Sequence, residues 1–170
     1  MDKTAIIEAA GPADVPDVLR LIRGLAEYEK LLHKVVATEA DLQESLFGAQ
    51  PAGECLIARV DGRAVGLAIY FRNLSTFVGK PGLYLEDLFV EPSCRGLGIG
   101  YALLRAVASI AVERGYARVD WSVLDWNEPA IRFYKGIGAL PIEEWTIFRL
   151  QGDALEGFVR NAKTGGDQSK

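Results

Sequence analysis

Arg95-Gly96-Leu97-Gly98-Ile99-Gly100 is the stretch of this 170-residue chain on which both the fold and the function depend. It follows a strand-like apolar run, Leu83 to Val90, and opens a helix-like run, Tyr101 to Arg114. Three alternate glycines remove side chains from a tight turn, so several backbone N–H groups can converge on an anion at the positive end of a helix dipole. The guanidinium beside the turn adds a charge that suits a phosphate. The stretch therefore predicts a binding site for a pyrophosphate.

Two other phosphate-binding motifs differ from this turn. A P-loop ends in Gly-Lys-Ser/Thr, whereas Gly100-Tyr101-Ala102 offers neither a lysine for the phosphates nor a hydroxyl for magnesium. A dinucleotide-binding turn has the spacing Gly-x-Gly-x-x-Gly and an acid at the end of the next strand, whereas Asp120 here falls in the middle of that strand. The residues exclude P-loop chemistry and disfavour a dinucleotide.

The composition is that of a soluble globular domain. Hydrophobic residues make up 49% of the chain and charged residues 25%, and no apolar stretch reaches the roughly 18 residues of a membrane span. The N-terminal residues lack the basic and apolar regions of an export signal, and the only cysteines are Cys55 and Cys94. With a single histidine besides, we expect a cytoplasmic protein with reduced thiols, no metal and no membrane association. The net charge of −4 argues against nucleic acid as the main partner.

The order of the predicted elements describes an α/β domain, with a mixed sheet flanked by helices. Apolar or alternating runs predict strands over Ala5–Ala9, Cys55–Val60, Ala64–Arg72, Leu83–Val90, Ala117–Leu124 and Trp145–Leu150. Periodicity and capping residues predict helices over Pro12–Lys30, Thr38–Leu46, Tyr101–Arg114 and Asn127–Lys135, with a helical turn around Leu155–Val159. Asn73–Gly82 is expected to be a loop. We predict a single domain over residues 1–152 and a C-terminal extension over 153–170 that is disordered from Thr164 onward.

Three segments, in the same order, resemble the GNAT N-acetyltransferases. The glycine turn matches the Arg/Gln-x-x-Gly-x-Gly/Ala motif of that family, Tyr84-Leu85-Glu86-Asp87-Leu88-Phe89-Val90 resembles its fourth strand, and Trp126-Asn127-Glu128-Pro129-Ala130-Ile131-Arg132-Phe133-Tyr134 resembles the segment that closes its coenzyme site. The similarity is greatest to the diamine and thialysine acetyltransferase branch and runs from about Ile6 to Leu150. It implies a mostly antiparallel mixed sheet in a single domain, acetyl-CoA as cosubstrate and direct transfer of the acetyl group. It also implies a homodimer, in which the strand near Trp145–Leu150 contributes to the partner's site.

The resemblance also assigns residues to acetyl-CoA. The backbone from Leu88 to Val90 is expected to pair with pantetheine as an added strand, and the Leu88 amide to polarise the thioester carbonyl. The turn is expected to hold the pyrophosphate, and Asn127 corresponds to an asparagine that contacts pantetheine. Ala130 stands where the diamine enzymes often carry a serine. The expected coenzyme contacts are Leu88, Phe89, Val90, Arg95, Gly96, Leu97, Gly98, Ile99, Gly100, Tyr101, Asn127, Ala130 and Tyr134.

Acetylation of an amine near neutral pH benefits from a proton acceptor for the ammonium and a proton donor for the departing thiolate. In the resemblance Tyr134 faces the thioester sulfur, and a phenol with a pKa of about 10 can protonate a thiolate whose thiol has a pKa of about 8.5. Without the resemblance, Phe133-Tyr134 on an amphipathic helix is more typical of core packing. Glu86 is the candidate base and acts through a water molecule.

Glu86 and Asp87 are adjacent acids inside an apolar strand, and carboxylates are rarely buried without a partner or a task. Strand alternation sends them to opposite faces unless a β-bulge intervenes. In similar enzymes the first acid draws the amine proton and the second approaches the cationic substrate. The alternative is a salt bridge from either acid to an arginine.

The resemblance places the amine site at Tyr28, Glu29, Asp87, Glu144 and Trp145. It also expects further acids where this chain has Leu31-Leu32-His33-Lys34 and, in the loop after the third strand, Asn73-Leu74-Ser75-Thr76-Phe77. Each missing carboxylate removes roughly 1 kcal/mol of attraction to an additional ammonium. We therefore expect a small primary amine as substrate, such as thialysine, a lysine-like compound or a short diamine. Two alternatives are an enzyme that acetylates a protein N-terminus or lysine, and a non-catalytic module that binds acetyl-CoA.

Overall fold

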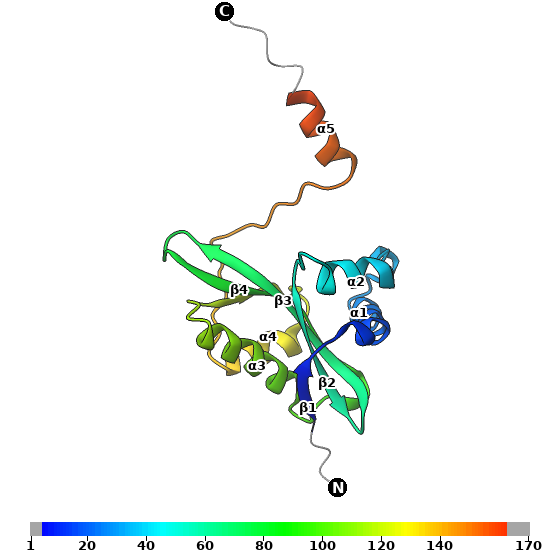
Figure 1. The fold of residues 1–170 in the computed structure, drawn as a ribbon. Helices are drawn as coiled ribbons and strands as arrows, with labels where there is room; N and C mark the ends of the chain where they lie inside the picture. Colours follow the sequence, from blue (N-terminus) through cyan, green and yellow to red (C-terminus); the bar gives the residue numbers. More distant parts are fainter. Residues whose placement is uncertain (1–4, 163–170) are drawn as a thin grey trace, which may run out of the picture. The chain divides into compact units, whose positions relative to one another are not determined.

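The computed structural model describes residues 5–162, which divide into two compact units, the first ending at Ser122 and the second beginning at Val123 (Figure 1). The first unit is built on a five-stranded sheet with the strand order β1-β2-β3-β4-β5. Neighbouring strands pair antiparallel except β4 and β5, which are parallel. The predicted mixed, mostly antiparallel sheet is thus confirmed. Its strands are β1 (Ile6–Ala9), β2 (Glu54–Val60), β3 (Arg63–Ser75), β4 (Lys80–Val90) and β5 (Val119–Trp121).

The helices of the first unit begin and end close to where the sequence predicts them. They are η1 (Pro12–Asp14), α1 (Val15–Tyr28), η2 (Leu32–Lys34), α2 (Glu39–Phe47), η3 (Pro92–Cys94) and α3 (Ile99–Glu113), where η marks a short 3₁₀ helix. Thr38 caps α2, because its hydroxyl accepts from the Asp41 N–H at 3.2 Å while the Asp41 carboxylate accepts from the Thr38 N–H at 2.8 Å. This capping box is a local signal, which explains why the start of α2 is predictable.

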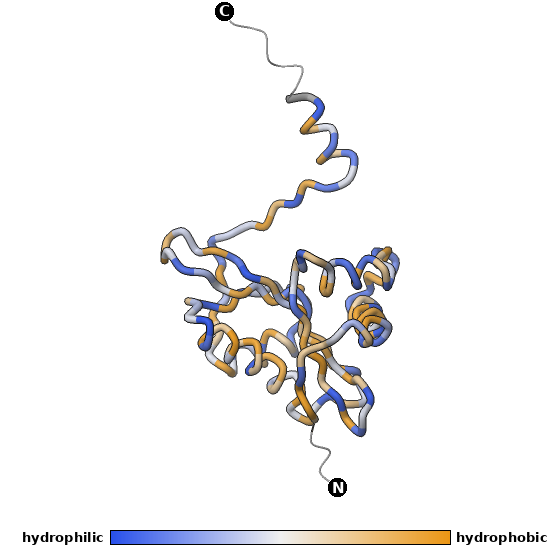
Figure 2. Tube along the Cα trace, in the orientation of Figure 1, coloured by the Kyte–Doolittle hydropathy of each residue, from blue (hydrophilic) through white to orange (hydrophobic). Residues whose placement is uncertain are grey.

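Helices α1 and α3 cover opposite faces of the sheet (Figure 1). Val18 of α1 packs in one core cluster with Ile57 of β2 and Leu67 of β3. Gly66 precedes Leu67 in the strand and faces the other way, where a Cβ atom on it would lie 3.3 Å from Leu103 of α3. Figure 2 shows hydrophobic residues along the strands between the two helices and hydrophilic residues at the turns. Both faces of the central strands are therefore buried.

Strand β4 departs from regular pairing at Glu86. Ile69 of β3 pairs with Asp87 and Tyr70 pairs with Leu85, so Glu86 is an extra residue that forms a β-bulge. On its other edge β4 pairs with β5 only over a short segment that ends at Leu85. Among residues 5–162 no strand pairs with this second edge between the bulge and the end of β4. The two parallel strands part at the bulge, and the edge of β4 beyond it is open.

Replacement of Gly66 by alanine tests the packing of this sheet. A Cβ atom at Gly66 would lie 2.8 Å from the Phe89 carbonyl oxygen, and the backbone of a central strand cannot move aside. We expect Gly66→Ala to lower the free energy of unfolding by about 3 kcal/mol through overpacking, as measured by urea denaturation. Gly100→Ala is the matched control, because its Cβ atom would meet only Val90 Cγ2 at 3.8 Å. An equal loss in both variants would contradict the packing described here.

Two predicted boundaries are wrong within the sheet. The expected loop Asn73–Gly82 is mostly strand, since β3 continues to Ser75 and Leu74 pairs with Pro81 across the hairpin. The polar and glycine residues of this segment do not alternate with hydrophobic residues as in a typical strand. The extension of β3 and β4 depends on their pairing with each other. Conversely, the expected strand Ala117–Leu124 is shortened to β5, because its pairing with β4 stops where β4 bulges.

The second unit contains α4 (Glu128–Gly136) and α5 (Asp153–Ala162), and α5 extends the helical turn predicted around Leu155–Val159. The predicted strand Trp145–Leu150 is wrong, because this segment is neither helix nor strand in the structure. Apolar side chains are frequent along it, but a strand also needs the N–H and C=O groups of a neighbour. The disorder predicted from Thr164 onward concerns residues outside the described part of the chain.

Candidate active site

The glycine turn has a backbone that only glycine adopts without strain. Gly96 has φ of 77° and Gly98 has φ of 76°, both in the left-handed region, and a Cβ atom on either would meet nothing within 4 Å. Their requirement for glycine is thus conformational and not a matter of space. Gly98 is the N-cap of α3 and no side chain caps that helix. No side chain therefore occupies the backbone N–H groups at the start of this 15-residue helix, which are the groups that can bind an anion.

Arg95 stands at the start of this turn and makes three contacts. Its Nε donates to the Val90 carbonyl oxygen at 3.0 Å. Its guanidinium carbon lies 4.3 Å from the centre of the Tyr28 ring and 5.7 Å from the centre of the Phe89 ring. Leu97 and Tyr101 are both more than half exposed on the same turn. The predicted pyrophosphate residues are therefore brought together on one accessible segment.

Leu88 and Val90 direct their backbone groups toward the open edge of β4. The Glu91 N–H donates to the Val65 carbonyl oxygen of β3 at 2.8 Å, so the peptide groups of Glu91 face β3. Because successive residues of a strand point these groups to opposite sides, those of Val90 and Leu88 face away from β3. An extended ligand can therefore add to this edge as another strand would.

Asp87 and Glu29 form an acidic site on the α1 face of the sheet. Asp87 pairs with Ile69, whose side chain packs against the core cluster that includes α1. Burial raises the pKa of Asp87 to about 6, and the negative charges of Glu86 and Glu29 act in the same direction. Burial also raises the pKa of Glu29 at the C-terminal end of α1. A cation placed among these carboxylates would be favoured, because it would relieve their mutual repulsion.

Glu86 is exposed on the bulge, immediately before Asp87. Neither acid forms a salt bridge with an arginine in the described part of the chain, and several arginines of the first unit pair with other acids. Arg20 and Arg63 bind Glu91, and Arg114 binds Glu54. The structural alternative for the two acids, a salt bridge to an arginine, therefore finds no support among residues 5–162.

The remaining predicted site residues belong to the second unit. The Asn127 side-chain oxygen accepts from the Ala130 N–H at 3.4 Å and so caps α4, which agrees with the predicted helix start. Tyr134 lies on α4, with its ring centre 5.3 Å from that of Phe133. Glu144 and Trp145 lie in the segment without regular structure, and Trp145 is 70% exposed.

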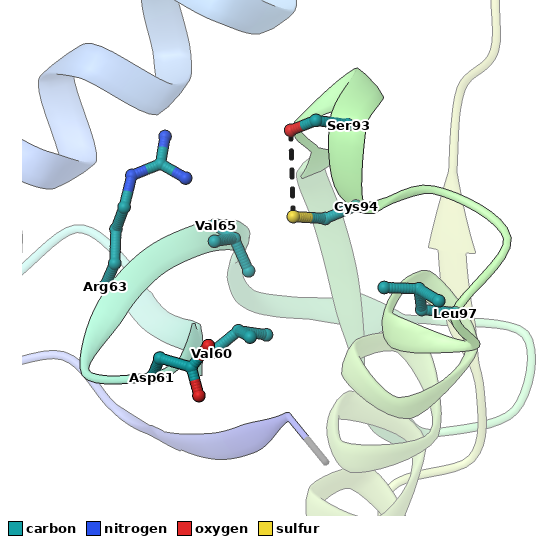
Figure 3. A pocket seen from close by; sticks show the side chains of 7 residues that line it. All are labelled: Val60, Asp61, Arg63, Val65, Ser93, Cys94 and Leu97. Atoms are coloured by element: carbon teal, nitrogen blue, oxygen red, sulfur yellow. Dashed lines mark hydrogen bonds between the residues drawn. The ribbon is translucent and has the colours of Figure 1, made fainter. Parts of the chain in front are cut away.

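A hollow of about 300 Å³ lies on the hairpin side of the glycine turn (Figure 3). Its lining residues are Val60, Asp61, Arg63, Val65, Ser93, Cys94 and Leu97. Of the predicted site residues only Leu97 contributes to it, so this hollow is not the predicted amine site. The Cys94 thiol lies 3.8 Å from the Ser93 hydroxyl.

Two further features bear on cofactors and location. Within residues 5–162 no group of three or more His, Cys, Asp or Glu side chains is arranged to hold a metal ion. No helix in the described part of the chain is long and apolar enough to cross a membrane.

Gly24 in α1 has a packing role that the sequence does not predict. A Cβ atom there would lie 2.9 Å from the Phe89 ring, so the glycine lets that ring approach the helix. The available signal was the glycine itself, because a glycine inside an amphipathic helix costs about 1 kcal/mol relative to alanine and usually has a packing reason.

An enzyme that takes an acyl group from coenzyme A needs a peptide edge for the pantetheine arm and an anion-binding site for the pyrophosphate. The first unit has both features. Residues 22–139 match the profile of the Acetyltransferase (GNAT) family. The chain therefore belongs to the GNAT family and is an N-acetyltransferase, as the sequence predicts. The alternative of a non-catalytic module that binds acetyl-CoA is therefore rejected.

Several known proteins are similar to the chain. Thialysine N-epsilon-acetyltransferase of Mus musculus is 38% identical over 160 residues, which cover 88% of this chain and 94% of that protein. L-ornithine N5-acetyltransferase NATA1 of Arabidopsis thaliana is 32% identical, over 89% of this chain and 86% of that protein. Among solved structures, an integron cassette protein from the mobile metagenome of V. cholerae superimposes with a TM-score of 0.78 at 28% identity, covering 94% of this chain and 99% of that one.

Proposed function

We propose that this enzyme transfers the acetyl group of acetyl-CoA directly to a small primary amine, such as thialysine, a lysine-like compound or a short diamine. The observation that carries the proposal is the open edge of β4, which begins at the bulge and leads through Arg95 into the glycine turn. The relatives supply the substrate class, because the two curated proteins described above are named for the acetylation of thialysine and of ornithine.

The donor fits this edge in an extended form. The backbone groups of Leu88 and Val90 would hydrogen-bond the pantetheine arm, with the Leu88 N–H polarising the thioester carbonyl. Residues Gly96 to Tyr101 would hold the pyrophosphate through backbone N–H groups, aided by Arg95. The left-handed glycines and the uncapped start of α3 support this fit. Phe89, Asn127 and Ala130 complete the proposed coenzyme contacts by the family resemblance.

The acidic site is proposed to bind the amine. Asp87 and Glu29 would attract the ammonium, and Glu86 on the bulge would accept its proton through a water molecule. The neutral amine nitrogen then attacks the thioester carbon, and the thiolate leaves when the carbon–sulfur bond breaks. Tyr134 would give its proton to that thiolate and later recover one from solvent. The roles of Tyr134, Glu144 and Trp145 rest on the resemblance.

The residues after α1 and those of the β3–β4 hairpin favour a short amine over a polyamine. Leu31, Leu32 and Lys34 stand where an acidic groove would continue, and the hairpin carries Leu74, 63% exposed, and Phe77, 92% exposed. Apolar and basic side chains offer no attraction to a second or third ammonium.

We further propose that the enzyme is a homodimer. Trp145, Ile147 and Phe148 are 70%, 72% and 91% exposed, which is unfavourable for three large apolar side chains on one short segment. A second copy could pair with this segment as a strand. We expect light scattering after gel filtration to give the mass of two chains, and Phe148→Glu to shift it toward one chain. A monomeric wild type would overturn this proposal and leave the acetyltransferase assignment intact.

The test of the proposed function is a thiol-release assay with purified protein and acetyl-CoA. Thialysine, ornithine and putrescine are compared with a lysine-containing peptide at equal concentration. Faster release with a small amine than with the peptide supports the proposal. Faster release with the peptide would favour the alternative of a protein acetyltransferase.

A further inference from the structure

We propose that Tyr28 is a positioning residue for the acetyl donor: its ring holds the Arg95 guanidinium in place at the pyrophosphate site. The family resemblance assigns Tyr28 to the amine, whereas the structure brings its ring to the coenzyme turn. The inference rests on the proposed function in one respect, since it takes Arg95 as a residue that binds the pyrophosphate.

The geometry points to a guanidinium held between two aromatic rings. The Arg95 guanidinium carbon lies 4.3 Å from the Tyr28 ring centre and 5.7 Å from the Phe89 ring centre, both within the range of a cation–π contact. Tyr28 is the last residue of α1, and Phe89 belongs to β4. Phe89 is itself only 4% exposed and lies against α1 at Gly24, so this side of the contact is rigid.

The hydrogen bond of Arg95 completes the arrangement. The Nε group donates to the Val90 carbonyl oxygen at 3.0 Å, which uses the inner edge of the guanidinium. Neither Nη group of Arg95 takes part in a hydrogen bond or ion pair within residues 5–162. One edge of the guanidinium is thus anchored, its face is covered by Tyr28, and the two Nη groups remain for a bidentate contact with a phosphate.

This arrangement matters because an arginine at the start of an exposed turn would otherwise populate many rotamers. A side chain that is already ordered loses less conformational entropy when the ligand binds. The effect of Tyr28 should therefore appear in the affinity for a donor that carries the pyrophosphate. It should be absent for a donor that lacks it.

The experiment compares Tyr28→Leu and Tyr28→Met, which lose the ring, with Tyr28→Phe, which keeps it. Dissociation constants of acetyl-CoA are measured by calorimetry, and kcat/KM is measured for acetyl-CoA and for S-acetyl-pantetheine, which has no pyrophosphate. We expect the loss of the ring to weaken acetyl-CoA binding about tenfold and to leave kcat/KM for S-acetyl-pantetheine and KM for the amine unchanged. Tyr28→Phe should restore wild-type binding.

Tyr116→Leu is the matched control. The Tyr116 ring also lies under a guanidinium, since the Arg72 guanidinium carbon is 6.0 Å from its centre, but this contact is at a different site. It should not alter acetyl-CoA binding. Arg95→Ala should weaken acetyl-CoA binding, and the addition of Tyr28→Leu to Arg95→Ala should have no further effect.

Three outcomes would overturn the inference, and they bear differently on the proposed function. If Arg95→Ala weakens acetyl-CoA binding while both ring-deletion variants bind it normally, the positioning role is wrong and the proposed function stands. If ring deletion instead raises KM for the amine equally with both donors, Tyr28 belongs to the amine site. If Arg95→Ala leaves acetyl-CoA binding unchanged, the assignment of Arg95 fails, and the inference fails with it.

Discussion

Tyr134→Phe is expected to lower kcat for acetyl transfer by about 10²–10³-fold, the range of a lost general acid. The change removes one hydroxyl and keeps the ring, so packing against Phe133 is preserved. Without that proton the leaving group departs as a bare thiolate, and the barrier to breakdown of the tetrahedral intermediate rises. Steady-state kinetics with a saturating amine measure kcat, and calorimetry measures acetyl-CoA binding.

Acetyl-CoA binding to the Tyr134→Phe variant should stay close to that of the wild type, which separates loss of chemistry from loss of donor. Tyr116→Phe is a suitable control, since it removes a tyrosine hydroxyl outside the proposed site and should leave kcat unchanged. A Tyr134→Phe variant that transfers acetyl groups at the wild-type rate while still binding the donor would show that Tyr134 is not the acid.

Asp87→Asn is expected to have two opposite effects at neutral pH. It should lower kcat/KM for the amine by about 10²-fold, because the ammonium loses a buried counter-charge. It should also raise the free energy of unfolding by about 1–3 kcal/mol at pH 7.5, since each pKa unit corresponds to about 1.4 kcal/mol. The ordinary pKa of an aspartate is 3.8, and burial raises that of Asp87 to about 6.

The sign of the stability change is set by proton binding. Between about pH 4 and pH 6 the folded state binds more protons at Asp87 than the unfolded state, so its contribution to stability falls as pH rises through this window. Above pH 6 the charged carboxylate imposes its full cost, and below pH 4 it is neutral in both states. Asp87→Asn should therefore stabilise the protein at pH 7.5 and not at pH 4.

Urea denaturation at the two pH values measures this difference. Glu86→Gln is the neighbouring comparison: because Glu86 is exposed, its neutralisation should change stability less at pH 7.5 than that of Asp87. A loss of stability in Asp87→Asn that is the same at pH 4 and pH 7.5 would contradict the account of the acidic site.

Local signals in the sequence predict much of the fold. The glycine turn, the start of α3 and the capping box at Thr38 each depend on residues within one turn of chain, and the structure confirms them. The sequence does not predict whether a bulge forms at Glu86, because its formation depends on how β4 pairs with β3. The parting of β4 from β5, which creates the open edge, likewise depends on a second strand.

The sequence does not predict the long-range contacts of the candidate site. Nothing in the order of residues shows that Arg95 lies on the Tyr28 ring, because the two are distant in the chain and meet only when α1 packs against β4. The predicted strand over Trp145–Leu150 is wrong for a related reason. Its apolar residues are compatible with a strand, but a strand forms only where a neighbour supplies backbone partners.

Acetylation of a small primary amine is tested most directly by kcat/KM across an amine panel with saturating acetyl-CoA. The panel contains thialysine, lysine, ornithine, putrescine, spermidine and spermine. We expect at least one of the small amines to exceed spermine, because the carboxylates that would bind the distant ammonium groups of a polyamine are replaced by residues such as Leu31, Leu32 and Lys34. A value for spermine above that of every small amine would contradict a preference for small primary amines.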